Sequence, residues 1–300
     1  MRKPLSQPSA SPLTRHISAC NNAVLPGERR RLRLGPAQIG WVRHEVAQHL
    51  LGFGAAEADD ALVVPDANML ARAAEALAAE GAYHWRDEAF DVRAVPDGPV
   101  LAQLDRGALP LFGILAWGVH VNGLVQRSDS LHLWIARRAA DKLLDPGKLD
   151  HLVAGGVAAR MTLEGTLAKE AQEEAGMPPA LASQARRVAT ISYAMERPEG
   201  LRRDVLACYD LALPAEFQPR ALDGEVALFE LWPMDEVLDR VRRTDEFKFN
   251  VNLVLIDLFL RLGVLPEPEA AALRAALDGP LLHDGRASPS GPATPPGLLR

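Results

Sequence analysis

The segment GGVAARMTLEGTLAKEAQEEAG, residues 155–176, constrains the fold more than any other part of the chain. Two glycines lead into a short loop, and a helical pattern follows that ends at Gly176, with prolines just beyond it. Thr162 suits the N-cap of such a helix, and a glycine suits the left-handed position after its last turn. The segment therefore predicts a loop and helix with defined ends.

Three carboxylates gather near the end of this helix. Glu170, Glu173 and Glu174 have i, i+3 and i+4 spacing, so they project from one face. Like charges at this spacing weaken an isolated helix by about 0.2–0.5 kcal/mol per pair. A divalent cation reverses that repulsion, because hard cations prefer carboxylate oxygens. The pattern predicts a metal site, although a solvated acidic face has the same spacing.

The stretch KEAQEEAG resembles the core of the Nudix box, G-x5-E-x7-R-E-U-x-E-E-x-G-U, in which U is apolar. Glu170, Glu173 and Glu174 stand at its acidic positions, and Gly176 stands at the closing glycine. The resemblance implies hydrolysis of a diphosphate linked to another group, with Mg²⁺ or Mn²⁺ as the cofactor.

Two positions depart from this pattern. Lys169 replaces the arginine, and the upstream glutamate is replaced by Met161, or by Thr162 if the count starts at the second glycine. We expect the metal site of three glutamates to survive and the contribution of the loop to be altered.

The resemblance extends over about residues 35–265. The stretches GVHVNG, WIARRAADKLLDPGKLDHLVAGG, ISYAMERPEGLRRDVLACYDLALP, DGEV and FKFN are similar to one Nudix branch, which is associated with thiamine pyrophosphokinase in fungi and plants. This branch implies cleavage of thiamine diphosphate, or of its oxidised analogues, to the monophosphate.

The resemblance also implies residue roles. Glu170, Glu173 and Glu174 would bind the metal, and Lys169 would hold these acids in position by a charge-assisted hydrogen bond. Glu173, Lys169 and Glu225 are the catalytic candidates. Glu225 could bind metal or accept a proton from water, and an edge-strand glutamate is an equally good interpretation of it.

Substrate-binding candidates come from the glycine pair and from a turn between two expected strands. The glycines free backbone groups for a phosphate, arginines could clamp phosphates, and an aromatic ring could line an apolar pocket. Arginines of this kind are usually solvated, and aromatic side chains are usually core. The candidates are Gly155, Gly156, Arg197, Arg202, Arg203 and Tyr193, with Trp134 and Phe247 as weaker aromatic alternatives.

Other functions remain open. A Nudix fold without turnover could be a sensor for a nucleotide or cofactor, and another nucleoside diphosphate derivative could be the substrate. Isomerase chemistry on isoprenyl diphosphates would need a cysteine in the site, whereas Cys208 falls on an expected strand and Cys20 in an expected tail. His120 has no companion histidine at the spacing of a zinc motif.

Composition sets the broad class. The net charge is -6 and hydrophobic residues make up 48% of 300 residues, which favours a globular protein and gives no reason to expect nucleic acid. Two distant cysteines form no disulfide framework, so a reducing cytoplasm is the simplest setting. No apolar run reaches the roughly 20 residues that span a bilayer. The expected partner is a small-molecule diphosphate, and the oligomeric state stays open.

The expected architecture is an α/β/α Nudix sandwich with a mixed sheet, preceded by a small α/β region. The expected divisions are a disordered tail at 1–34, an α/β region at 35–110, a Nudix domain at 111–266, and a helix with a disordered tail at 267–300. The tail at 1–34 has the composition of a transit peptide, but its prolines favour an ordinary tail. Helices are expected at 36–53 and 67–81, and Asn122-Gly123 predicts a hairpin turn.

Overall fold

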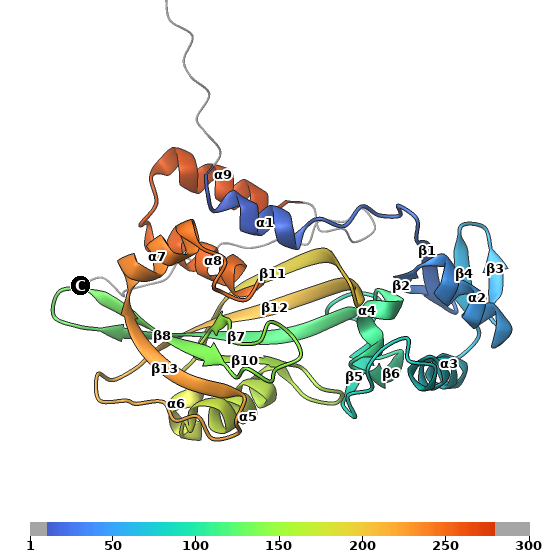
Figure 1. The fold of residues 1–300 in the computed structure, drawn as a ribbon, viewed down its shortest axis with the longest axis horizontal. Helices are drawn as coiled ribbons and strands as arrows, with labels where there is room; N and C mark the ends of the chain where they lie inside the picture. The colour runs from blue at the N-terminus through green and yellow to red at the C-terminus, as the bar shows by residue number, and fades with distance from the viewer. Residues whose placement is uncertain (1–10, 280–300) are drawn as a thin grey trace, which may run out of the picture.

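A computed structural model describes residues 11–279, and a seven-stranded mixed sheet forms its centre (Figure 1). Five strands follow the order β11-β12-β7-β8-β13, while β10 pairs with β7 and β9 pairs with β8. β7 runs parallel to β12, and the other pairs are antiparallel. The strands are β7 (Leu115–Gln126), β8 (Leu131–Arg138), β9 (Leu149–Asp150), β10 (Val153–Gly156), β11 (Arg186–Arg197), β12 (Gly200–Ala212) and β13 (Val226–Pro233).

Helices cover both faces of this sheet (Figure 1). One face carries α5 (Leu163–Ala175) and α6 (Pro179–Ala182). The opposite face carries α7 (Met234–Arg243), α8 (Val251–Leu262), α9 (Glu267–Leu277) and α1 (Thr14–Cys20). The mixed α/β sandwich predicted from the sequence is therefore confirmed.

Alternation along β12 shows why its middle, residues 205–209, is apolar. Leu206 and Cys208 join the core beneath α8, whereas Ala207 and Tyr209 join the core beneath α5. Successive side chains of a strand point to opposite faces, so a strand covered on both sides has no solvent face to fill with polar residues.

The N-terminal part has its own sheet, of order β2-β1-β4-β3, and a separate core. Leu32, Ile39, Leu70 and Phe112 are fully buried members of that core. The strands are β1 (Arg30–Leu34), β2 (Ala37–Val42), β3 (Ala56–Ala58), β4 (Ala61–Val64) and the separate pair β5 (Ala89–Val92) and β6 (Ala102–Asp105). The helices are α2 (His44–Gly52), α3 (Ala67–Ala79) and α4 (Ala108–Phe112).

The helix expected at 36–53 is wrong in its first half. Residues 37–42 form β2, and only 44–52 are helical. Ile39, Trp41 and Val42 favour a strand because their side chains are β-branched or aromatic. A Cβ on Gly40 would lie 2.2 Å from the carbonyl oxygen of Phe112, so glycine permits this close approach.

The hairpin turn expected at Asn122-Gly123 is also wrong, because both residues lie inside β7. Asn122 is fully buried and donates a hydrogen bond of 2.8 Å to Asp210. Gly123 leaves room for Leu152, whose Cδ2 would lie 2.4 Å from a Cβ at that position. Contacts with residues distant in sequence therefore keep this dipeptide in an extended strand instead of a turn.

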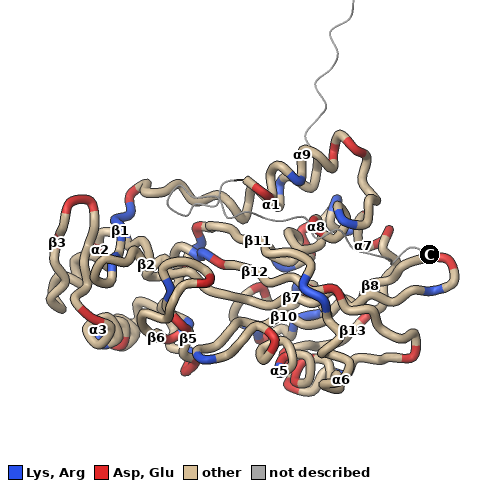
Figure 2. The backbone as a smooth tube through the Cα atoms, turned by 180° about the vertical axis from the view of Figure 1, so that it is seen from behind, with Lys and Arg blue, Asp and Glu red and all other residues tan. Residues whose placement is uncertain are grey.

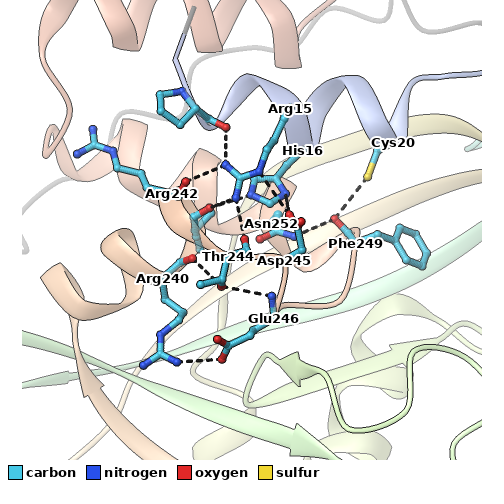
Figure 3. A network of polar contacts seen from close by, with 12 residues as sticks. Arg15, His16, Cys20, Arg240, Arg242, Thr244, Asp245, Glu246, Phe249 and Asn252 are labelled. Atoms are coloured by element: carbon cyan, nitrogen blue, oxygen red, sulfur yellow. Dashed lines mark hydrogen bonds and ion pairs between the residues drawn. The ribbon is translucent and has the colours of Figure 1, made fainter.

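The disordered tail expected at 1–34 needs correction for residues 11–34. Residues 14–20 form α1. Leu13, just before this helix, and Ile17 and Cys20 within it are buried in the core to which α8 also contributes. Arg15 of α1 donates to the carbonyl oxygens of Val241, Arg242 and Thr244 (Figure 3). The apolar positions of this short segment are what fix it to the sheet. Residues 1–10, and the tail expected after residue 279, lie outside the described residues.

The helix expected after residue 266 is present as α9, whose Leu273 is buried in the core shared with α8. Within residues 11–279, no helix combines the length and hydropathy that a membrane crossing requires.

Candidate metal and active site

The ends of α5 are fixed as the sequence predicted. The hydroxyl of Thr162 accepts a hydrogen bond of 2.9 Å from the backbone N–H of Gly165. Gly176 closes the helix with φ 60, a left-handed conformation that glycine adopts without steric cost. Leu167 and Ala171 pack against the sheet, which sets the rotation of the helix and therefore the direction of its acids.

Lys169 contacts two of these acids. Its Nζ lies 2.7 Å from Oε2 of Glu173 and 3.3 Å from Oε1 of Glu170. The hydrogen bond to Glu173 raises the pKa of Lys169 above its usual value. Lysine thus makes the contact that the resemblance assigns to an arginine. Acidic positions of α5 are red in Figure 2.

Glu174 points inward, unlike its neighbour Glu173. Glu174 is 7% exposed, and its Oε2 accepts a hydrogen bond of 2.9 Å from the backbone N–H of Ala154 in β10. This bond ties the last turn of α5 to the strand that carries the two glycines. The helix and the glycine loop therefore form one unit.

A narrow pocket brings Glu174 and Glu225 together. β8, β9, β10 and the start of β13 supply its walls, and α5 closes it. Two predicted site residues, far apart in sequence, thus line the same pocket. Its lining residues are Ala136, Arg138, Asp150, His151, Ala154, Glu174, Glu225 and Val226.

Crowded negative charge marks this pocket. Burial raises the pKa of Glu174 well above its usual value; the Ala154 N–H opposes this, and the charges of Asp150, Glu170 and Glu225 add to it. Burial also raises the pKa of Glu170, against the opposing effect of Lys169. A bound cation would stabilise the ionised form of these neighbouring carboxyl groups, which burial and mutual repulsion otherwise disfavour.

Glu225 is held differently. Burial alone would raise its pKa, but a hydrogen bond and ion pair with Lys142 lower it overall, with help from Arg106 and Arg138. Glu225 therefore stays ionised at neutral pH. An ionised carboxylate at the pocket edge suits a cation ligand better than it suits a strong base.

The donor set fits a hard divalent cation. Glu170, Glu174 and Glu225 supply carboxylate oxygens at or beside the pocket, and Glu173 adds one at the same helix face. Lys169 compensates Glu170 and Glu173 but has no contact with Glu174 among the described residues. Oxygen-only ligands of this kind suit Mg²⁺ or Mn²⁺ rather than zinc.

The glycine pair lies where side chains would collide. A Cβ on Gly155 would lie 2.4 Å from Cγ of Glu170, and one on Gly156 would lie 2.7 Å from Cζ of Phe90. Gly155 therefore allows Glu170 to lie against β10. The predicted contact of the glycine pair with a phosphate stays a prediction.

The predicted phosphate clamp lies elsewhere. Arg197 and Arg202 lie over the ring of Phe249, at 4.8 and 5.8 Å, and are paired with acids of this chain. Arg203 is buried and donates to the carbonyl oxygen of Gly113. Tyr193 is buried and donates to Asp204.

None of these four predicted residues is among those lining the pocket of Glu174. Their part in substrate binding stays a prediction. Trp134 and Phe247 are core residues, at 5% and 2% exposure.

Sequence reasoning missed an ionic network at the base of the pocket. Asp150 accepts from Arg138 at 2.9 Å and lies 3.6 Å from Lys248. Burial alone would raise the pKa of Asp150, but Lys248 and Arg138 lower it overall. Burial lowers the pKa of Lys248 despite the nearby Asp150 charge. No short motif marks these residues, because they come from separate elements.

The loop that carries Lys248 is fixed on both sides. Backbone bonds of 2.9 Å join Leu149 of β9 to Glu246 and Lys248. On the other side Arg15 of α1 binds the same loop (Figure 3). The helix α1 thus contacts the loop that positions Lys248 beside Asp150 of the pocket.

His120, Asp150 and His151 lie close enough to suggest a second metal site. Their contacts argue against it. Asp150 is already paired with Arg138 and Lys248, and a further cation would meet these two positive charges. Nδ1 of His120 lies 3.0 Å from Nδ1 of His151, so the rings bind each other. Burial lowers the pKa of His120 well below its usual value and that of His151 to about 4.

Comparison with known proteins shows which proteins this region is similar to. Residues 117–251 match the model of the NUDIX domain. Nudix hydrolase 20, chloroplastic, of Arabidopsis thaliana is 43% identical over 186 residues, which cover 62% of this chain and 50% of that protein. Nudix hydrolase 24, chloroplastic, of the same plant is 42% identical over 185 residues, again 62% and 50%.

An uncharacterized Saccharomyces cerevisiae protein is 29% identical over 204 residues, which cover 63% of this chain and 59% of that protein. The chain therefore spans about half the length of the two plant relatives. A crystal structure of a Deinococcus radiodurans protein is similar at a TM-score of 0.45 and 22% identity, covering 56% of this chain and 97% of that one. Together, the family model and the plant relatives show that residues 117–251 of this chain are similar to NUDIX domains.

Proposed function

We propose that this protein is a divalent-metal-dependent diphosphate hydrolase, with Glu170, Glu173 and Glu174 as the metal-binding acids. The observation that carries the proposal is the meeting of Glu174 and Glu225 in one pocket against Glu170, in a region that matches the Nudix model. The names of the plant relatives, Nudix hydrolases, support it.

The residues divide the work between them. When bound, Mg²⁺ or Mn²⁺ would neutralise the charge that spreads over the phosphoryl oxygens. Glu170, Glu173 and Glu174 would hold that cation together with Glu225, and Lys169 fixes the side chains of Glu170 and Glu173. A water attacks phosphorus, the bridging P–O bond breaks, and the proton of the water passes to Glu173. Glu173 suits this role because its half-exposed side chain can release the proton to solvent.

The preferred substrate in this proposal is thiamine diphosphate or an oxidised analogue, cleaved to the monophosphate and phosphate. Similarity to the branch associated with thiamine pyrophosphokinase is its support. A nucleoside diphosphate derivative is the alternative substrate, and a sensor without turnover is the alternative function. The retained E-x-x-E-E triplet favours turnover over the sensor.

A panel of diphosphates tests both levels of the proposal. Purified protein is incubated with Mg²⁺ or Mn²⁺ and thiamine diphosphate, its oxidised forms, ADP-ribose or other nucleoside diphosphate derivatives, and the products are separated by chromatography. The control pair is Glu173→Gln and Glu164→Gln, two acids of the same helix, of which Glu164 lies exposed in its first turn. Cleavage that requires metal and Glu173 but not Glu164 is expected.

The outcomes separate the levels. If thiamine diphosphates stay intact while a nucleoside derivative is cleaved, the substrate is wrong and the hydrolase stands. If no diphosphate is cleaved but one binds tightly, the sensor replaces the hydrolase.

We also propose a cytoplasmic location and a division near residue 110, between the N-terminal sheet, which begins with β1, and the region that follows. The names of the two plant relatives place those proteins in the chloroplast, so an organellar location is the competing proposal. Cell fractionation separates the two locations. Limited proteolysis that cuts near residue 110 would support the division.

A further inference from the structure

His151 has a buried polar atom with no partner. It lies between β9 and β10, is 2% exposed, and lines the pocket of Glu174. Its Nδ1 contacts Nδ1 of His120 at 3.0 Å, while its Nε2 has no hydrogen-bond partner among the described residues. A buried polar atom left unpaired costs about 1–3 kcal/mol. A buried, unpaired atom on a residue that lines a pocket indicates a place for a ligand.

The contact between the rings restricts the position of the proton. Two Nδ1 atoms at hydrogen-bond distance need one donor and one acceptor, and a neutral imidazole carries a single proton. If His120 donates, His151 accepts at Nδ1 and must carry its own proton at Nε2. If His151 donates instead, its Nε2 is a bare lone pair.

The pocket favours a proton on Nε2. With a cation bound, its walls would contain the carboxylates of Asp150, Glu174 and Glu225, and a diphosphate would add more acceptor oxygens. Arg138 already donates to Asp150 and to the carbonyl oxygens of Asp145 and Leu144. An N–H at Nε2 would therefore have partners, whereas a lone pair there would face other acceptors.

Building on the proposed function, we propose that His151 is a substrate-binding residue that donates a hydrogen bond from Nε2 to a non-bridging oxygen of the diphosphate. His120 is its positioning residue, because the hydrogen bond from its Nδ1 selects the tautomer. The ligand class is the diphosphate group itself, whatever is attached to it. A charge-assisted bond of this kind changes affinity by about 10- to 100-fold.

Two amide substitutions separate the ring nitrogens. The amide of asparagine reaches the position of Nδ1, and that of glutamine reaches the position of Nε2. His151→Asn therefore keeps the contact with His120 and loses the donor to the substrate, whereas His151→Gln does the opposite. His44→Gln changes an exposed histidine at the start of α2 and serves as the control.

Binding of imidodiphosphate in the presence of Mg²⁺ is measured by calorimetry, together with kcat and KM for a cleaved diphosphate. We expect His151→Asn to weaken imidodiphosphate binding by about tenfold or more, and His151→Gln and His44→Gln to stay within about threefold of wild type. The affinity for Mg²⁺ alone is expected to stay the same in all variants. A loss in His151→Gln equal to or larger than that in His151→Asn would overturn the proposal, as would wild-type binding in both.

Substitutions at His120 keep the test open if the His151 variants do not fold. His120→Asn retains a donor at the Nδ1 position and should bind imidodiphosphate like wild type, while His120→Gln should bind it more weakly. The reverse order would contradict the proposal. Wild-type protein that neither binds imidodiphosphate nor cleaves any diphosphate would instead overturn the proposed function.

Discussion

Glu174→Gln tests the crowding of acids in the pocket, because glutamine keeps the shape of the side chain and removes its charge. Glu174 is 7% exposed and, within residues 11–279, accepts one hydrogen bond, from Ala154, which offsets part of the cost of a buried charge. We expect two effects of opposite sign. Without metal the variant should be more stable to unfolding than wild type. Addition of Mg²⁺ should stabilise the variant less than it stabilises wild type.

The first effect depends on pH. The pKa of Glu174 is raised in the folded state, so the folded protein holds its proton at pH values where the unfolded chain has released it. Stability of the metal-free wild type therefore falls as pH rises from about 4.5 toward the folded pKa. Glu174→Gln lacks this pH dependence because glutamine does not ionise. At pH 5 the two proteins should be similar, and at pH 8 the variant should be more stable by about 1–3 kcal/mol.

The second effect follows from binding linkage. A ligand at 100 times its Kd stabilises the folded state by about 2.7 kcal/mol. For a chain of this size each kcal/mol raises Tm by about 2–3 °C. Saturating Mg²⁺ should therefore raise the Tm of wild type by roughly 5–8 °C, and that of Glu174→Gln by less than half as much.

Differential scanning calorimetry at pH 5 and pH 8, with and without Mg²⁺, measures both effects. Glu164→Gln is the matched control on α5 and should shift with Mg²⁺ as wild type does. If Glu174→Gln were less stable than metal-free wild type at pH 8, or gained the full Mg²⁺ shift, the crowding argument would be wrong.

Three further predictions follow from individual contacts. Lys169→Ala should lower kcat at least tenfold, and Lys169→Arg should restore most of it, because arginine can reach both Glu170 and Glu173; steady-state kinetics checks the pair. Gly155→Ala should weaken Mg²⁺ binding by displacing Glu170, whose Cγ would lie 2.4 Å from the new Cβ; calorimetric titration measures this, and unchanged affinity would refute the steric argument. Arg15→Ala removes donors to two carbonyl groups in the last turn of α7 and to that of Thr244 in the loop that follows, so it should lower stability by about 1–3 kcal/mol and speed hydrogen exchange in residues 244–250, with Arg72→Ala on α3 as an exchange control.

Local signals predicted α5 well. Thr162 and Gly176 fix its ends through bonds and backbone angles within a few residues, so the sequence alone places them. The same holds for the turn between β11 and β12, and for α3, whose Asp66 cap accepts from Met69. In these places the local preference and the tertiary structure agree.

The errors arose where distant contacts decide. Asn122-Gly123 has the sequence of a hairpin turn, but Asp210 and Leu152 hold it inside β7. Leu13 and Ile17 lie in a segment with the composition of a tail, and α8 supplies the core that orders them. Neither partner is visible from the local sequence.

The site was predictable only in part, for the same reason. The spacing of the acids on α5 shows that they share a helix face. It does not show which residues of other elements lie opposite that face. His151 precedes the glycine pair by only a few residues, yet its role depends on His120, which lies on another strand. No motif links the two histidines, and only their contact in the folded chain reveals the unpaired Nε2.

The most direct test of the metal site is a titration of the protein with Mn²⁺, in which electron paramagnetic resonance measures the unbound ion. Wild type should bind Mn²⁺ with an affinity that competing Mg²⁺ lowers, and the double variant Glu170→Gln/Glu173→Gln should leave most of the ion free. If the folded wild type leaves Mn²⁺ unbound, or if the double variant binds it equally well, the acids of α5 are not the metal ligands.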